Sequence, residues 1–251
     1  MRKLLPLLAL ALTGCVGSQI YNPSLMIPGE DLEAGSIRLI ASAGPAPYSH
    51  RDSLVAFSQD GYEVFTGLPV NRSYGYLADV TAQIGLKNRQ MLQLRGWAEL
   101  EFPWNRWGAS MGYLYWISHS ADNRSDWDFG IQPSVAVVGD PYAAQGWGVQ
   151  VAGVVRRRIN DKMSSYGGFA PIYGRVPELP QSMLQLAELQ NIENPRPDGW
   201  GAGLHFGVEY TFIPRLTGRV DINLMVQQDL FYREIRALPC FTIGVGYDIL
   251  R

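Results

Sequence analysis

The sequence predicts an all-β fold, an antiparallel up-and-down transmembrane β-barrel of about ten strands. Long segments alternate apolar and polar residues with a period of two, as strands with two different faces do. Aromatic residues gather at the ends of these segments, on the apolar face. No apolar run approaches the ~20 residues of a membrane-spanning helix, so a closed barrel is the remaining way to cross a bilayer.

The amino terminus reads as a targeting signal. Arg2 and Lys3 precede the apolar run Leu4–Leu12, which is too short to span a bilayer and is typical of a signal peptide. The next residues complete Leu-Thr-Gly-Cys, which resembles the lipobox of bacterial lipoproteins, cut between Gly14 and Cys15 and acylated on the cysteine. The resemblance implies a lipoprotein signal peptide at 1–14 and a lipidated tether at 15–34. It also implies the outer membrane, because Val16 and not Asp follows the cysteine. An ordinary signal peptide is the alternative.

The predicted barrel occupies residues 35–251. Alternation is cleanest at 200–212, where Leu204 and Phe206 lie on one face and His205 and Glu209 on the other. It recurs at 36–44, 74–86, 90–102, 107–118, 126–138, 145–157, 216–226 and 239–250, and more weakly at 54–66. Most of these segments exceed the 5–6 residues of soluble strands and match membrane strands.

Alternation alone does not say which face points outward. A lipid-anchored soluble barrel that binds an apolar ligand would alternate too, with its apolar face inward. The polar face here carries Gly, Ser, Gln, Asn, Arg, Asp and Glu but almost no Lys, which suits a narrow interior better than a solvated surface. Aromatic residues at both ends of the apolar faces fit two interfacial girdles. These features favour the membrane barrel, with the soluble barrel as the alternative.

The number of strands predicts on which side of the membrane each connection lies. Ten strands place both termini in the periplasm; eight is the fallback if 36–66 does not form two strands. The turns at 103–106 and 213–215 then fall on the periplasmic side, and 158–198 becomes a long outer loop. Arg157 and Arg158 would lie on the outer side, where they offer charge-assisted hydrogen bonds to the phosphates of lipopolysaccharide.

The last predicted strand carries a further pattern. Thr242, Gly244, Tyr247 and Ile249 resemble the carboxy-terminal signal that the barrel assembly machinery recognises, although Leu250-Arg251 departs from the commoner terminal Phe. The two resemblances imply the barrel assembly and lipoprotein sorting machineries as partners, beside outer-membrane lipids. A net charge of −2 does not suggest a nucleic-acid partner.

Few residues suggest chemistry, and none predicts a metal or cofactor. His119, between Ser118 and Ser120, resembles the His and Ser of small lipid A deacylase barrels, but residues adjacent in a strand point to opposite faces. His205, Glu209, Arg219 and Asp221 are expected to form a polar network that fills the lumen, because buried charges persist when paired. With Cys15 acylated, Cys240 has no partner for a disulfide.

These observations together predict a non-enzymatic outer-membrane lipoprotein barrel with a structural role, or one that passes or binds a small solute. A lipid A ester hydrolase is the alternative from the enzyme class.

Overall fold

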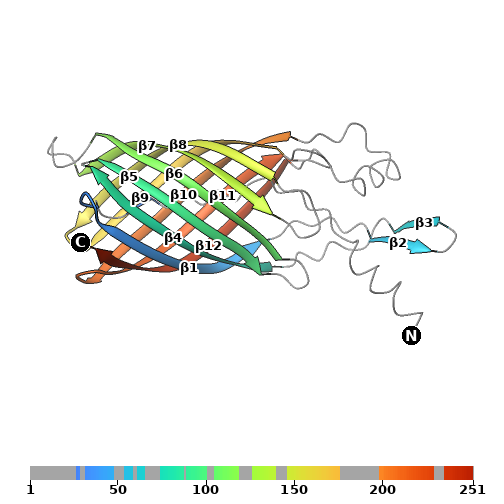
Figure 1. Cartoon of the computed structure of the whole chain (residues 1–251), viewed down its shortest axis with the longest axis horizontal. Helices are drawn as coiled ribbons and strands as arrows, with labels where there is room; N and C mark the ends of the chain where they lie inside the picture. The colour runs from blue at the N-terminus through green and yellow to red at the C-terminus, as the bar shows by residue number, and fades with distance from the viewer. Residues whose placement is uncertain are drawn as a thin grey trace.

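Ten strands close into an antiparallel barrel, and the strands cross its axis at a steep tilt (Figure 1). The computed structural model describes residues 27–28, 32–47, 54–58, 61–65, 74–87, 89–100, 105–118, 126–139, 146–175, 198–228 and 235–250. The all-β, antiparallel barrel of about ten strands predicted from the sequence is therefore confirmed.

The barrel is a meander in which each strand pairs with the next along the chain. Its strands are β1 (Ile37–Pro47), β4 (Tyr74–Lys87), β5 (Gln90–Leu100), β6 (Asn105–Ser118), β7 (Trp127–Gly139), β8 (Gly146–Asn160), β9 (Met163–Arg175), β10 (Asp198–Ile213), β11 (Leu216–Gln228) and β12 (Ile235–Leu250). β1 pairs with β4 on one side and with β12 on the other, which closes the barrel.

The two ends of the barrel differ. One end holds the start of β1, the end of β12 and the connections 88–89, 119–126, 161–162 and 214–215; we call it the terminal end. The opposite end, which we call the loop end, holds the connections 48–73, 101–104, 140–145, 176–197 and 229–234. The three tightest turns of the barrel, of two residues each, thus lie at the terminal end.

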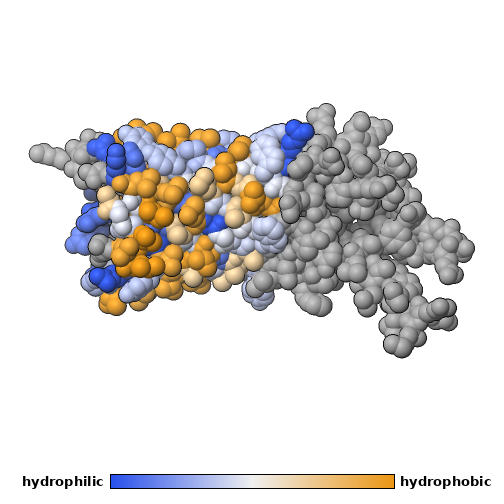
Figure 2. Space-filling view, viewed as in Figure 1, coloured by the Kyte–Doolittle hydropathy of each residue, from blue (hydrophilic) through white to orange (hydrophobic). Residues whose placement is uncertain are grey.

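The two faces of the barrel wall are chemically distinct, with apolar side chains outside and polar side chains inside. On β1, the outward Leu39 is 39% exposed whereas the neighbouring inward Arg38 is 1% exposed. Hydrophobic residues are spread over the flank of the barrel between its ends, interspersed with residues of intermediate hydropathy (Figure 2). A soluble barrel would place its apolar face inside, so the lipid-facing orientation is the one that the fold adopts. In the described part of the chain, no helix has the length and apolarity to span a membrane.

The predicted long loop at 158–198 is wrong in part, because residues 163–175 form β9. The strand escapes the alternation pattern because its outward face carries Ser165, Gly167 and Pro171, which are hardly more apolar than its inward face. A tight turn at 161–162, in which the Asn160 side chain accepts a 2.9 Å hydrogen bond from the Lys162 amide, leads from β8 into β9. Residues 176–197 lie outside the described residues.

The weak strand predicted at 54–66 is not part of the barrel. It forms two short strands, β2 (Leu54–Ser58) and β3 (Gly61–Phe65), which pair with each other in a separate sheet beyond the loop end (Figure 1). The prediction therefore counted one strand that the barrel lacks, at 54–66, and missed β9. The predicted total of ten strands is right, but the strands between these two positions run in the opposite direction to the one predicted.

The opposite direction of these strands reverses two predictions. The turns predicted together on the periplasmic side separate: the connection 101–104 lies at the loop end and 214–215 at the terminal end. Arg157, near the end of β8, lies at the terminal end, whereas the prediction placed it at the end opposite the termini. Its guanidinium sits 5.3 Å from the centre of the Trp127 ring. The contact of Arg157 and Arg158 with lipopolysaccharide stays a prediction, and it requires the terminal end to face outward.

Candidate functional site in the barrel lumen

The inward face of the barrel concentrates charged side chains that water does not reach. Period-two alternation turns every second residue of each strand toward the lumen. The buried charged residues there are Arg38, Asp79, Arg95, Asp128, Arg156, Glu209, Arg219, Asp221 and Asp248, each at most 5% exposed. Burial of a charge costs free energy unless a partner and hydrogen bonds compensate it, and these residues form ion pairs within the lumen.

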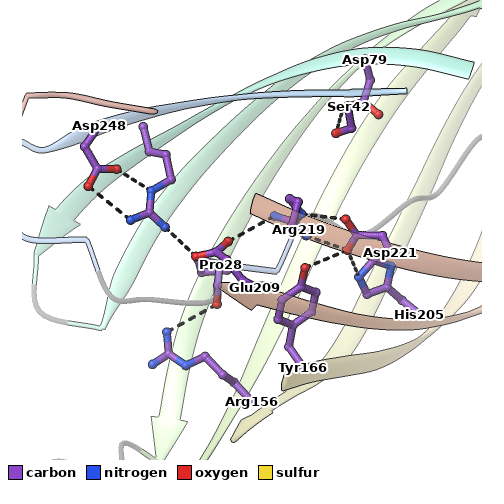
Figure 3. A network of polar contacts seen from close by, with 11 residues as sticks. Pro28, Ser42, Asp79, Arg156, Tyr166, His205, Glu209, Arg219, Asp221 and Asp248 are labelled. Atoms are coloured by element: carbon purple, nitrogen blue, oxygen red, sulfur yellow. Dashed lines mark hydrogen bonds and ion pairs between the residues drawn. The ribbon is translucent and has the colours of Figure 1, made fainter. Parts of the chain in front are cut away.

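The first and last strands are joined by an ion pair at the seam of the barrel. Arg38 on β1 and Asp248 on β12 are register partners. The Arg38 guanidinium donates to both Asp248 oxygens, with Nε to Oδ1 at 2.5 Å and Nη2 to Oδ2 at 3.3 Å. Its Nη1 also donates to Glu209 Oε1 at 3.0 Å, which extends the contact from the seam to β10 (Figure 3).

A second arginine continues the chain of charges. Arg219 on β11 is the register partner of Glu209, with Nη1 3.8 Å from Glu209 Oε2. Two residues along the same face, Asp221 accepts from Arg219 Nε at 2.7 Å and from Nη2 at 2.8 Å. Glu209 thus lies between two arginines, and Arg219 lies between two carboxylates.

His205 and Tyr166 complete this cluster on its other side. His205 Nε2 lies 3.2 Å from Asp221 Oδ1, and its Nδ1 contacts the side chain of Asn223. The Tyr166 hydroxyl donates to Asp221 Oδ1 at 2.9 Å, and its ring stacks on the imidazole with a centroid distance of 5.7 Å. We call these residues the lumen network: Arg38, Tyr166, His205, Glu209, Arg219, Asp221, Asn223 and Asp248.

Gly207 makes room for this packing. It lies between His205 and Glu209 on the inward face of β10, opposite Asp221 in the register. A Cβ at this position would collide with the Tyr166 ring and would lie 2.6 Å from Asp221 Oδ1. A residue without a side chain is therefore required for Tyr166 to reach its carboxylate partner.

Two smaller ion pairs lie on other strands of the lumen wall, one on β4 and β5 and one on β7 and β8. Asp79 on β4 accepts from Arg95 Nη2 at 3.0 Å and from the Ser42 hydroxyl at 3.2 Å. Arg156 on β8 binds Asp128 on β7, with Nε 2.7 Å from Oδ2, and its guanidinium sits 4.5 Å from the centre of the Trp116 ring. Each buried aspartate of the wall therefore faces an arginine.

The geometry of the lumen network fits a role in packing the lumen and holding strands together through ion pairs better than a role in catalysis. A general base must face a substrate, yet His205 is 1% exposed and its two ring nitrogens already face Asp221 and Asn223. In the described residues, no group of three or more His, Cys, Asp or Glu side chains could hold a metal ion.

The four residues predicted to form a lumen network, His205, Glu209, Arg219 and Asp221, are brought together by the structure. Their further partners were not predicted from the sequence. Arg38 and Asp248 lie on the polar faces of predicted strands, but their pairing depends on how the barrel closes. Tyr166 belongs to β9, which was not predicted.

The other predicted residues fall elsewhere. His119 lies outside the described residues, as do Cys15 and Gly14. In the terminal pattern, Thr242 and Gly244 point inward, whereas Tyr247 and Ile249 are 51% and 47% exposed on the outer face. Cys240 forms no disulfide within the described part of the chain.

Comparison with known proteins gives likeness of fold alone. No protein-family model matches the chain, and no curated protein matches it. Solved structures do match at low identity. An outer membrane channel from Pseudomonas putida F1 is 9% identical over 90% of this chain and 100% of its own, with a TM-score of 0.43. A bacterial polysaccharide outer membrane secretin is 8% identical over 86% of this chain and 99% of its own, with a TM-score of 0.45.

A loop-deletion mutant of OmpT, an outer membrane protein of Vibrio cholerae, is 13% identical over 72% of this chain, with a TM-score of 0.33. The chain spans 56% of that protein's length. At such values none of these likenesses bears on what this chain transports, binds or does.

Proposed function

We propose that this chain is a non-enzymatic, lipid-anchored barrel of the bacterial outer membrane with a structural role, and that its lumen is closed to solutes when the barrel is intact. The terminal end faces the periplasm in this proposal, because short turns and both termini of such barrels lie there. The loop end and its longer connections then face outward.

The burial of the lumen network is the observation that carries the proposal. A water-filled pore leaves its charged lining accessible, whereas Arg38, Arg156 and Arg219 are at most 2% exposed. Barrels near this size are largely filled by side chains. Ion pairs between β1, β10, β11 and β12 also hold the closing strands in register, which suits a rigid scaffold.

Reconstitution into liposomes tests the closed lumen. Vesicles that contain the intact protein should take up small sugars no faster than protein-free vesicles, while vesicles with a general porin serve as the positive control. Uptake near the porin rate would contradict the proposal. Lipid A from cells that overproduce the protein should keep its acylation pattern by mass spectrometry; a shortened pattern would favour the ester hydrolase instead.

A further inference from the structure

The lumen wall is not uniformly polar. Inward side chains of β5, β6, β8 and β9 form an apolar strip, and Ile27, which precedes β1 and belongs to no strand, is buried against it with no exposed surface. We call it the apolar strip; its residues are Met91, Leu114, Trp116, Ala152, Val154 and Ala170. Part of the segment predicted to be a simple tether at 15–34 therefore lies inside the barrel.

A polar contact adds to this apolar burial. The carbonyl of Pro28, also buried, accepts a hydrogen bond of 3.5 Å from Nη1 of Arg156 (Figure 3). Arg156 is held in turn by Asp128 and lies over Trp116. Proline has no amide hydrogen, so its carbonyl is the one backbone group of this residue that needs a partner inside the lumen.

A tight turn then leads the segment out of the lumen toward β1. The Gly35 amide donates to the Gly85 carbonyl at 2.8 Å, and the Gly85 amide donates to the Ser36 carbonyl at 3.0 Å. The Ser36 hydroxyl donates to the Glu33 carbonyl at 2.6 Å. A Cβ on Gly85 would collide with the Glu33 carbonyl, so this glycine is needed for the turn to approach β4.

The described parts of this segment and the lumen network fill different sides of the same interior. The network lies on β9 to β12 and β1, whereas Ile27 covers β5, β6, β8 and β9. Tyr166 belongs to both, because its hydroxyl bonds Asp221 and its ring is part of the cluster around Ile27. Small residues such as Ala152 and Ala170 leave the space that Ile27 occupies.

We propose that Ile27 and Pro28, with the turn 33–36, form a built-in plug that the apolar strip binds, and that displacement of the plug opens a path for small solutes between the apolar strip and the lumen network. This inference rests on the proposed function, because it assumes that the lumen of the intact barrel is closed to solutes. Its occupant is the chain's own N-terminal segment, and the vacated path would have the apolar strip on one side and the lumen network on the other.

Thiol cross-linking tests the position of the plug independently of transport. In a Cys240→Ser background, the pair Ile27→Cys and Ala152→Cys places two thiols inside the lumen, whereas Ile27→Cys with Gly153→Cys places the second thiol one residue along β8, on the lipid face. A short bifunctional maleimide should join the first pair and not the second. The single Ile27→Cys variant controls for other thiols. Equal yields for both pairs, or none for the first, would overturn the plug.

Transport by plug variants tests its role. Ile27→Asp places a charge against the apolar strip and should raise sugar uptake into liposomes several-fold over the intact protein, while Ile27→Val should leave uptake unchanged. Heat-modifiable migration verifies that each variant is folded. A folded Ile27→Asp barrel that stays closed refutes the plug but leaves the closed scaffold intact. Rapid uptake by the unaltered protein refutes the proposed function instead. If Ile27→Asp does not fold, the cross-linking result decides.

Discussion

Arg38 and Asp248 pair directly across the seam where the first and last strands meet, as register partners joined by two hydrogen bonds. The same guanidinium reaches Glu209 on β10. Because a meander barrel is closed by its most distant strands, this contact joins segments that lie 210 residues apart in the chain. The seam is thus held by side chains as well as by the backbone ladder.

Replacement of the seam arginine should therefore destabilise the folded barrel. Arg38→Met leaves Asp248 and Glu209 buried with their shared arginine gone, and loss of one partner of a buried ion pair typically costs about 3–5 kcal/mol. The variant should lose its heat-modifiable compact band on gels at a clearly lower temperature than the unaltered protein. Leu39→Ala, one residue along and on the lipid face, is the control and should shift that temperature far less. Equal shifts would argue against a special role of the seam.

Gly207 should resist the addition of a single methyl group. Gly207→Ala places its Cβ in the Tyr166 ring, so the ring has to leave Asp221, and overpacking of this kind typically costs about 1–3 kcal/mol. Gly153→Ala is the matched control, because a Cβ there meets nothing within 4 Å. Urea unfolding in lipid vesicles should separate the two variants; similar midpoints would contradict the packing of Tyr166 on β10.

The Tyr166 hydroxyl and ring should contribute separately. Tyr166→Phe removes one hydrogen bond to Asp221, which keeps both bonds from Arg219, so the expected cost is about 1 kcal/mol. Tyr166→Ala also removes the ring that stacks on His205 and leaves a cavity, with an expected cost of about 3–5 kcal/mol. Unfolding free energies of the two variants check this order, and the reverse order would be incompatible with it.

The lipid proposed on Cys15 should be dispensable for membrane retention. An acyl anchor adds little when a barrel already spans the bilayer. Cys15→Ser should therefore remain in the membrane pellet after alkaline carbonate extraction, although its mass should lack the acyl chains. Release of Cys15→Ser into the supernatant would favour the soluble barrel that the sequence left as an alternative.

Strands with strong contrast between their faces were predictable from sequence. In β10, large apolar residues such as Leu204 and Phe206 alternate with Gly203, His205 and Gly207, and the observed strand includes the whole predicted segment. β9 was not predictable in this way. It carries the small residue Gly167 on its outer face and the large residue Tyr166 on its inner face, the reverse of the size pattern in β10. The β2–β3 hairpin shows the opposite error, since a short strand can alternate without joining the barrel.

The lumen network was predictable only in part, for a physical reason. Glu209 and Arg219 lie on consecutive strands joined by a short turn, so their proximity follows from local register. The contacts of Arg38 with Asp248 and of Arg156 with the Pro28 carbonyl join distant segments. Such contacts depend on closure and on the path of a segment that belongs to no strand, and alternation carries no information about either.

Tryptophan fluorescence in brominated lipid tests the central claim most directly, which is that the apolar face of the barrel meets the bilayer. Trp147 and Trp200 lie outward, at 40% and 56% exposure, whereas Trp116 lies inward at 3%. In single-tryptophan variants, phospholipids with brominated chains should quench Trp147 and Trp200 strongly and leave Trp116 nearly unchanged. Quenching of Trp116 with protection of Trp147 and Trp200 would contradict the orientation of the barrel wall, and with it the membrane-spanning fold.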